Sequence, residues 1–142
     1  MKRYTLIDHT ADIGIDIFGD TLSDLFSNAG FAMFDIITDI TTVEAKDQRI
    51  IKVEGIDREQ LLVDWLGELL YLYDVKNLLF KDFLITDMNE NQLTASLTAT
   101  IRGEKYCETK HTINTEIKAV THHALSVKLE HNRWKARVIF DL

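Results

Sequence analysis

The spacing of apolar residues divides the chain into segments with periods of about 3.6 residues and segments with a period of two. Two segments have helical spacing, and each follows a residue that can cap a helix. Thr21 precedes the first and Asp57 the second, with Asp24 and Gln60 as their capping partners three residues further on. The apolar positions are Leu22, Leu25, Phe26, Ala29, Met33, Ile36 and Ile37 in the first, and Leu62, Trp65, Leu66, Leu69 and Tyr73 in the second. We therefore predict two helices, each with one buried face.

The remaining apolar segments alternate with polar residues, which is typical of half-buried strands. The clearest strand is 93–102, where Leu, Ala and Ile alternate with Thr, Ser and Arg. Segments 125–130 and 134–141 alternate on either side of a turn at 131–133 and predict a hairpin. Further strands are predicted at 4–7, 13–18, 48–54, 78–87 and 115–120. This pattern predicts an α+β fold, a two-layer sandwich with both helices packed on one face of a mixed, mostly antiparallel sheet of six to eight strands.

The length and charge of the chain narrow the choice of partners. A chain of 142 residues without a linker or repeat is expected to form one domain over residues 1–142. It has 23 acidic and 16 basic residues, a formal net charge of −7. Binding to a phosphate backbone depends on clustered Lys and Arg, so little direct binding to nucleic acid is expected. An acidic chain is better suited to a cation or to a basic protein partner.

The sequence also indicates a cellular compartment. The single cysteine, Cys107, cannot form an intrachain disulfide, and this favours a reducing environment. Residues 1–3 lead directly into a predicted strand, without the apolar core of a signal peptide. No apolar run approaches the roughly 20 residues that span a bilayer. We expect a cytoplasmic protein without a membrane segment.

The first candidate functional residues lie in the stretch Asp8-His9-Thr10-Ala11-Asp12, between the first two predicted strands. Two carboxylates, an imidazole and a hydroxyl in five residues form either a polar turn or a site. Asp and Thr side chains commonly bond to nearby backbone groups in turns, so the turn is the simpler interpretation. The stretch alone does not decide between the two.

The end of the chain suggests a second half for such a site. Asp141 ends a predicted strand, next to the α-carboxylate of Leu142, and both Asp141 and Asp12 have the parity opposite to the buried residues of their strands. If the two strands lie antiparallel side by side, the two carboxylates converge. Such close like charges require a proton or a cation between them, and oxygen ligands favour Ca²⁺ or Mg²⁺. The alternative is that the strands are not neighbours and both side chains are solvated.

Other residues give weaker indications. His122 and His123 are adjacent on an apparent strand, so they are expected to point to opposite faces and not to share a metal. His9 and His111 have no local partner at the spacing of metal ligands. Lys118 is either a surface amine or a contact to an anionic group.

Several stretches of the sequence resemble the archease family. In chain order they are Asp8-His9-Thr10-Ala11-Asp12-Ile13-Gly14, Leu62-Val63-Asp64-Trp65-Leu66, Glu68-Leu69-Leu70, Gly103-Glu104, Ile117-Lys118-Ala119-Val120-Thr121-His122-His123 and Arg137-Val138-Ile139-Phe140-Asp141-Leu142. Together they span essentially the whole chain, and the first and last blocks are the most specific. His122 departs from the family pattern, in which a tyrosine is expected.

The resemblance implies a non-enzymatic accessory protein of tRNA splicing. Such a protein assists the RNA-splicing ligase that joins RNA ends through a guanylylated histidine, promoting guanylylation and repeated turnover. The resemblance places a metal site at Asp12, Asp141 and the backbone oxygen of Leu142, with Ca²⁺ or another divalent cation such as Mg²⁺ or Mn²⁺. Lys118 matches a lysine associated with activation, and Asp8 and His9 share the signature as further candidates for activating the partner.

Two other functions stay open. The resemblance also suggests a chaperone that modulates the specificity of a tRNA cytosine methyltransferase. A stand-alone metal-dependent hydrolase ranks third, because a sparse carboxylate site lacks an evident general base or nucleophile.

Overall fold

The structure is a computed structural model and describes residues 2–7 and 11–142. In this part of the chain, the α-helices are α1 (Leu22–Ile37) and α2 (Arg58–Lys76), and a 3-10 helix, η1 (Ile40–Thr42), follows α1. The strands are β1 (Tyr4–Ile7), β2 (Asp12–Gly19), β3 (Asp47–Gly55), β4 (Leu78–Glu90), β5 (Ala95–Lys105), β6 (Ala119–Val120), β7 (Ser126–Glu130) and β8 (Arg133–Asp141). The predicted α+β class is confirmed.

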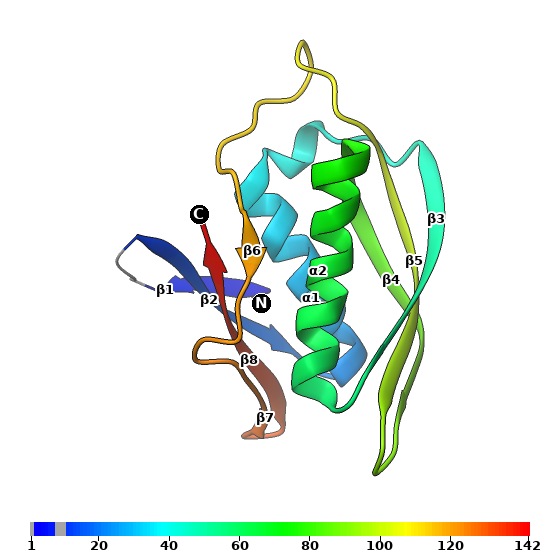
Figure 1. The fold of residues 1–142 in the computed structure, drawn as a ribbon, viewed down its shortest axis with the longest axis vertical. Helices are drawn as coiled ribbons and strands as arrows, with labels where there is room; N and C mark the ends of the chain where they lie inside the picture. Colours follow the sequence, from blue (N-terminus) through cyan, green and yellow to red (C-terminus); the bar gives the residue numbers. More distant parts are fainter. Residues whose placement is uncertain (1, 8–10) are drawn as a thin grey trace.

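The eight described strands form two sheets instead of one (Figure 1). The first has the order β1-β2-β8-β6, with β7 also paired to β8, and the second has the order β3-β5-β4. All pairings between these strands are antiparallel. The alternation of residues identifies strands but not their partners, and for this reason the division into two sheets was not predicted.

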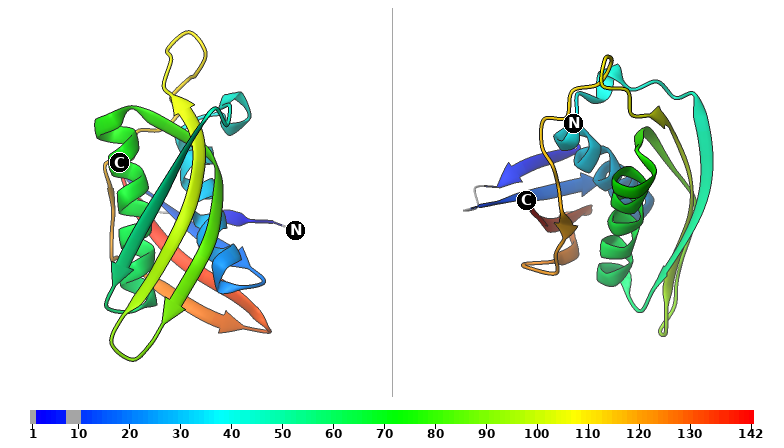
Figure 2. Two further views of the ribbon diagram at one scale, coloured as in Figure 1. Left: turned by 90° about the vertical axis from the view of Figure 1, so that its right-hand side faces the viewer. Right: turned by 45° about the horizontal axis from the view of Figure 1, so that its top comes forward.

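Both helices lie between the two sheets, as the views in Figures 1 and 2 show. Helix α1 contacts β2 and β4, and helix α2 contacts β3 and β6. The prediction placed both helices on one face of a single sheet, whereas each of them packs against both sheets. Most of the surface of α2 is therefore covered, and only a narrow stripe of this helix remains open to solvent.

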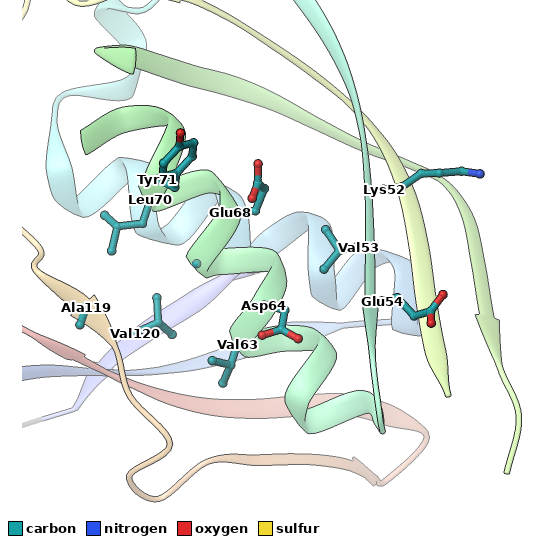
Figure 3. Close-up of a pocket in the computed structure, with 11 residues that line it drawn as sticks. Lys52, Val53, Glu54, Val63, Asp64, Glu68, Leu70, Tyr71, Ala119 and Val120 are labelled. Carbon is teal, nitrogen blue, oxygen red and sulfur yellow. The ribbon is translucent and has the colours of Figure 1, made fainter. Parts of the chain in front are cut away.

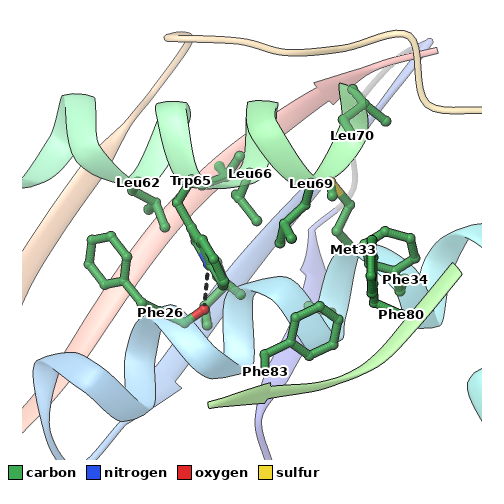
Figure 4. Packing of buried hydrophobic residues seen from close by; sticks show 14 of the residues in the cluster. Phe26, Met33, Phe34, Leu62, Trp65, Leu66, Leu69, Leu70, Phe80 and Phe83 are labelled. Carbon is green, nitrogen blue, oxygen red and sulfur yellow. Dashed lines mark hydrogen bonds between the residues drawn. The ribbon is translucent and has the colours of Figure 1, made fainter. Parts of the chain in front are cut away.

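The core is built around the contact between the helices (Figure 4). Trp65 of α2 is fully buried, and its indole N–H donates to the backbone carbonyl of Phe26 in α1 at 2.8 Å. Further along α1, the ring of Phe34 packs edge-on against Phe80 and stacked against Phe83, with centroids 5.7 and 5.8 Å away. These aromatic contacts join α1 to β4 and fix the first helix against the second sheet.

The predicted helix caps are present at both N-termini. The Thr21 hydroxyl accepts the amide hydrogen of Asp24 at 3.0 Å, and the Asp57 carboxylate accepts that of Gln60 at 2.8 Å. At the other end of α2, Asn77 adopts a left-handed conformation with φ 58° and closes the helix. Local sequence therefore sets the start of each helix.

Replacing Asp57 by alanine should lower the free energy of unfolding by about 1 kcal/mol, because an amide at the start of α2 loses its acceptor. Equilibrium unfolding in urea measures this change. Asp57→Asn is the matched control, since asparagine caps helices equally well and should cost little. An equal loss in both variants would show that the carboxylate acts through its charge and not as a cap.

The terminal hairpin is also confirmed, with a shorter turn than predicted. Glu130 pairs with Arg133, which leaves only His131 and Asn132 in the turn. Both have positive φ values, 51° and 61°, which is typical of the type I′ turn that matches the twist of a two-residue hairpin. Arg133 belongs to β8, so the hairpin register places Asp141 at the far end of that strand.

In the described part of the chain, no helix is both long and apolar enough to cross a lipid bilayer.

Candidate functional site

The structure brings Asp12 and Asp141 together. Asp12 is the first residue of β2 and Asp141 the last of β8, and the antiparallel register pairs them directly. Side chains that face each other across such a pair project from the same side of the sheet, with Cβ atoms about 4.5–5.5 Å apart. The predicted convergence of the two carboxylates required these two strands to be antiparallel neighbours, and this condition is confirmed.

A third segment completes this end of the sheet. Ala119 of β6 pairs with Asp141 from the other side, and the amide of Lys118 donates to the Asp141 carbonyl oxygen at 2.8 Å. The Lys118 side chain is exposed, and Leu142 is half-buried against the core. We call Asp12, Lys118, Asp141 and Leu142 the acidic tip. The other two candidates, Asp8 and His9, lie outside the described residues.

The donor set of the acidic tip suits a hard cation. Asp12 and Asp141 contribute carboxylate oxygens, and Leu142 can add a backbone oxygen, which are the ligand types that Ca²⁺ and Mg²⁺ prefer. Within residues 2–7 and 11–142, no three His, Cys, Asp or Glu side chains gather into a metal-binding group. A cation at the tip would therefore complete its coordination with backbone oxygens, water or a partner.

The next charged pair on the same face of the sheet consists of opposite charges. Asp16 pairs with Arg137 in the strand register, and the guanidinium donates to both carboxylate oxygens at 2.9 and 3.0 Å. This hydrogen bonding and the negative charge of Asp16 raise the pKa of Arg137. Asp16 and Asp12 share the same parity, but the pairing register gives Asp16 a basic partner and Asp12 an acidic one.

The structure reveals a second charged cluster, around Glu104. This buried carboxylate accepts from the Glu44 amide at 2.8 Å, from Lys110 Nζ at 3.0 Å and from His111 Nε2 at 2.9 Å. Burial alone would raise the pKa of Glu104, but these hydrogen bonds outweigh burial and bring it to about 2. His111 Nδ1 accepts the Cys107 amide hydrogen at 2.9 Å.

We interpret the Glu104 cluster as a structural clasp, because its groups bond to one another, to the Glu44 amide and to the Cys107 amide of the segment 106–118. That segment connects β5 to β6 and so carries the chain from one sheet to the other. His111 has no predicted partner, since seven residues separate it from Glu104 in the sequence. The local signals were the polar character of His111 in a mostly irregular segment and the Gly103-Glu104 block of the family resemblance.

The prediction that His122 and His123 occupy a strand is wrong. Strand β6 ends at Val120, and the chain then turns through Ala124, which has a φ of 52°. His122 Nε2 lies 3.0 Å from the side-chain oxygen of Gln60 in α2, while His123 is exposed. The two residues lie in a turn that the hydrogen bond from the Leu125 amide to the His122 carbonyl closes, and the alternation rule for strands does not apply to them.

The sequence and the fold were compared with known proteins. The family model of the Archease protein family matches residues 4–142. The Protein archease of Methanosarcina mazei is 40% identical over 141 residues, which are 99% of this chain and 97% of the relative. That of Pyrococcus abyssi is 39% identical over 143 residues and the full length of both chains.

Two solved structures have a similar fold. The solution structure of Methanobacterium thermoautotrophicum protein 1598 has a TM-score of 0.87 and 39% identity, and each chain covers 100% of the other. The crystal structure from Thermotoga maritima, described as an archease and possible chaperone, has a TM-score of 0.63 and 21% identity, over 96% of this chain and 94% of that one. This second likeness concerns the fold alone. From the family model and the identity to its relatives, we conclude that the chain belongs to the archease family.

Proposed function

We propose that this protein is a non-enzymatic accessory protein of tRNA splicing that activates an RNA-splicing ligase. In this proposal it promotes guanylylation of the ligase's active-site histidine and allows repeated turnover. The observation that carries the proposal is the pairing of Asp12 with Asp141, which places two carboxylates at one end of a sheet. Membership of the archease family supports the accessory role.

The acidic tip would hold a divalent cation, with Ca²⁺ as the preferred occupant. Two carboxylates directly opposite each other repel, and a bound cation would turn this repulsion into attraction. When bound, the cation would supply a positive charge for phosphate oxygens. Asp12 and Asp141 would hold it from two neighbouring strands, and the backbone oxygen of Leu142 would be the third ligand.

The surroundings of the tip suit contact with the nucleotide pocket of a partner. Three strands, β2, β8 and β6, meet at Asp141 and hold the backbone of the tip in place. The exposed side chain of Lys118 lies in the segment that is hydrogen-bonded to Asp141, and its ammonium group could bind an anionic group such as a phosphate. In this proposal, the tip presents opposite charges side by side to a partner that binds a nucleotide.

The Asp141→Asn variant should stimulate guanylylation of the purified RNA-splicing ligase at least about tenfold less than the wild type, since a charge on an essential ligand is lost. The rate is measured with radiolabelled GTP and sub-stoichiometric accessory protein. Asp12→Asn should have a similar effect. Asp82→Asn, at an exposed position of β4, is the matched control and should stimulate normally. Full stimulation by both tip variants would exclude the tip as the activating element.

Calcium should bind the wild-type protein and raise its Tm, because binding to the folded state alone stabilises that state. Titration calorimetry and thermal unfolding with Ca²⁺ and then Mg²⁺ measure both effects. The Asp141→Asn variant should show neither response. If ligase stimulation depends on Asp141 while no cation binds, the tip acts through its carboxylates alone.

A chaperone of a tRNA cytosine methyltransferase is the alternative, and the description of the Thermotoga maritima relative as a possible chaperone is compatible with it. Pull-down of the two purified enzymes in parallel separates these functions. Capture of the methyltransferase without the ligase would favour the alternative. Turnover by the isolated protein would favour the hydrolase.

A further inference from the structure

A groove of about 640 Å³ runs along the open stripe of α2 (Figure 3). Helix α2 forms its floor, β3 forms one side and β6 the other. The lining residues of the floor are Val63, Asp64, Gly67, Glu68, Leu70 and Tyr71. Since β6 also pairs with the strand that ends at Asp141, the groove begins next to the tip but does not include its carboxylates.

Gly67 lies at the centre of the floor, where the packing of the fold does not require a glycine. Outside its chain neighbours and the backbone of its own helix, a Cβ atom added to Gly67 would meet no atom of the described residues within 4 Å, and the φ of Gly67 is not positive. Gly30 in α1 is different, because a Cβ atom there would lie 2.7 Å from the ring of Phe83. Glycine inside a helix lowers stability by roughly 0.5–1 kcal/mol relative to alanine. At Gly67 no packing contact compensates for this loss of stability. The absence of a side chain leaves the helix backbone accessible to an occupant of the groove.

One side of the groove is an open strand edge. The groove is lined by three consecutive residues of β3, Lys52, Val53 and Glu54. In Figure 3 Val53 points toward the helix, whereas Lys52 and Glu54 point away from it. Successive side chains of a strand point to opposite faces, so a cavity that touches all three residues is bounded by the edge of the strand. Strand β3 is the outermost strand of its sheet, and its free backbone groups can pair with an added strand.

The charges on the floor indicate what such a strand would carry. Asp64 and Glu68 both face the groove, one helical turn apart. Four helical residues rise about 6 Å, and two residues of an extended strand rise about 6.6 Å. Two basic side chains at alternate positions of an extended segment would therefore match the two carboxylates. Val63, Leu70 and Tyr71 provide apolar contacts beside them, and the Tyr71 side chain is 48% exposed.

We propose that this groove binds an extended, basic segment of a protein partner, which adds as a strand to the free edge of β3 and crosses over Gly67. Its lysine or arginine side chains, two residues apart, pair with Asp64 and Glu68. The groove anchors the partner, while the acidic tip beside it remains free for its own contacts. The proposal goes beyond ligase activation and does not require that the partner be the ligase.

The test uses the full chain and a blocked lysine–valine pentapeptide, Val-Lys-Val-Lys-Val, as the probe. NMR titration of ¹⁵N-labelled protein should show shifts centred on Val53, Gly67 and Val120, and the amides of β3 should exchange more slowly with solvent. The same peptide with glutamate in place of lysine should give no shifts. Because no ligase is present, this result is independent of the outcome of the guanylylation experiment.

Variants of the floor identify the mode of binding. Glu68→Lys should weaken peptide binding about fivefold or more, from the loss of an ion pair and the added repulsion. Gly67→Phe should abolish binding by filling the groove, without a lower Tm, since the position has open space. Gly67→Ala should raise Tm by about 1–4 °C. Asp82→Lys, a charge reversal on the exposed part of β4, should bind as the wild type does.

Three outcomes of the peptide experiments would overturn the proposal. They are equal binding of the lysine and glutamate peptides, unchanged binding by Gly67→Phe, and the absence of shifts along β3. A dimer seen in sedimentation that Gly67→Phe dissociates would show that a second copy of the chain fills the groove, and would also overturn it.

Discussion

Replacing Trp65 by alanine should lower the free energy of unfolding by about 4 kcal/mol. The side chain is fully buried between α1 and α2, and its removal leaves a large cavity where both sheets converge on the helices. The substitution also removes the hydrogen bond from the indole to the Phe26 carbonyl. Urea unfolding followed by circular dichroism measures the loss.

Trp134 provides the comparison within the same chain. It is half-buried, and the Arg58 guanidinium lies over its ring at 4.9 Å from the centroid. Trp134→Ala removes mainly a surface cation–π contact and partial burial, so it should cost clearly less than Trp65→Ala. Equal losses would mean that the helices are not held together by the contact at Trp65.

Replacing Glu104 by alanine should be nearly as damaging, with a loss of about 3 kcal/mol. The substitution leaves the Glu44 amide and the buried His111 ring without their common acceptor. Glu104→Gln is the matched control, since an amide oxygen can still accept from the same donors. A smaller loss in Glu104→Gln than in Glu104→Ala would show that the acceptor, and not the charge alone, stabilises the clasp.

The same cluster should give the protein a defined response to acid. Its hydrogen bonds hold the pKa of Glu104 at about 2, below the ordinary value of 4.5. The unfolded chain therefore binds a proton more readily, and the stabilisation by the carboxylate is fully present above the unfolded value and lost as pH falls through the folded value. The difference in unfolding free energy between wild type and Glu104→Gln should accordingly shrink between pH 5 and pH 2. A constant difference over this range would contradict the assigned role of the charge.

Local structure was predictable because its causes lie within a few residues. The caps at Thr21 and Asp57 depend on contacts three residues away, and both are where the sequence places them. The strand predicted at 93–102 is present as Ala95–Lys105, and the terminal hairpin forms around His131 and Asn132. The errors occur where the pattern is shortest, as at His122 and His123, which lie beyond the two residues of β6.

The candidate site was also predictable only in part. Parity along a strand assigned Asp12 and Asp141 to the face away from the core, and it assigned Asp16 to that face as well. Parity does not determine which strands are neighbours. The pairing register places Asp141 opposite Asp12 and Arg137 opposite Asp16. Glu104 and His111 show the same limit, because their contact depends on the path of an irregular segment.

The sequence by itself determined the two helices, their caps, most strands, the resemblance to the archease family and the side of their strands on which Asp12 and Asp141 lie. These features follow from side-chain periodicity and short-range hydrogen bonds, which neighbouring residues specify. Only the tertiary structure decided that the strands form two sheets around the helices, that β2, β8 and β6 meet at Asp141, and that a groove opens over Gly67. These features depend on which distant segments pack together. Burial of apolar surface stabilises contact between any apolar segments, so it does not by itself specify which segments pack against each other.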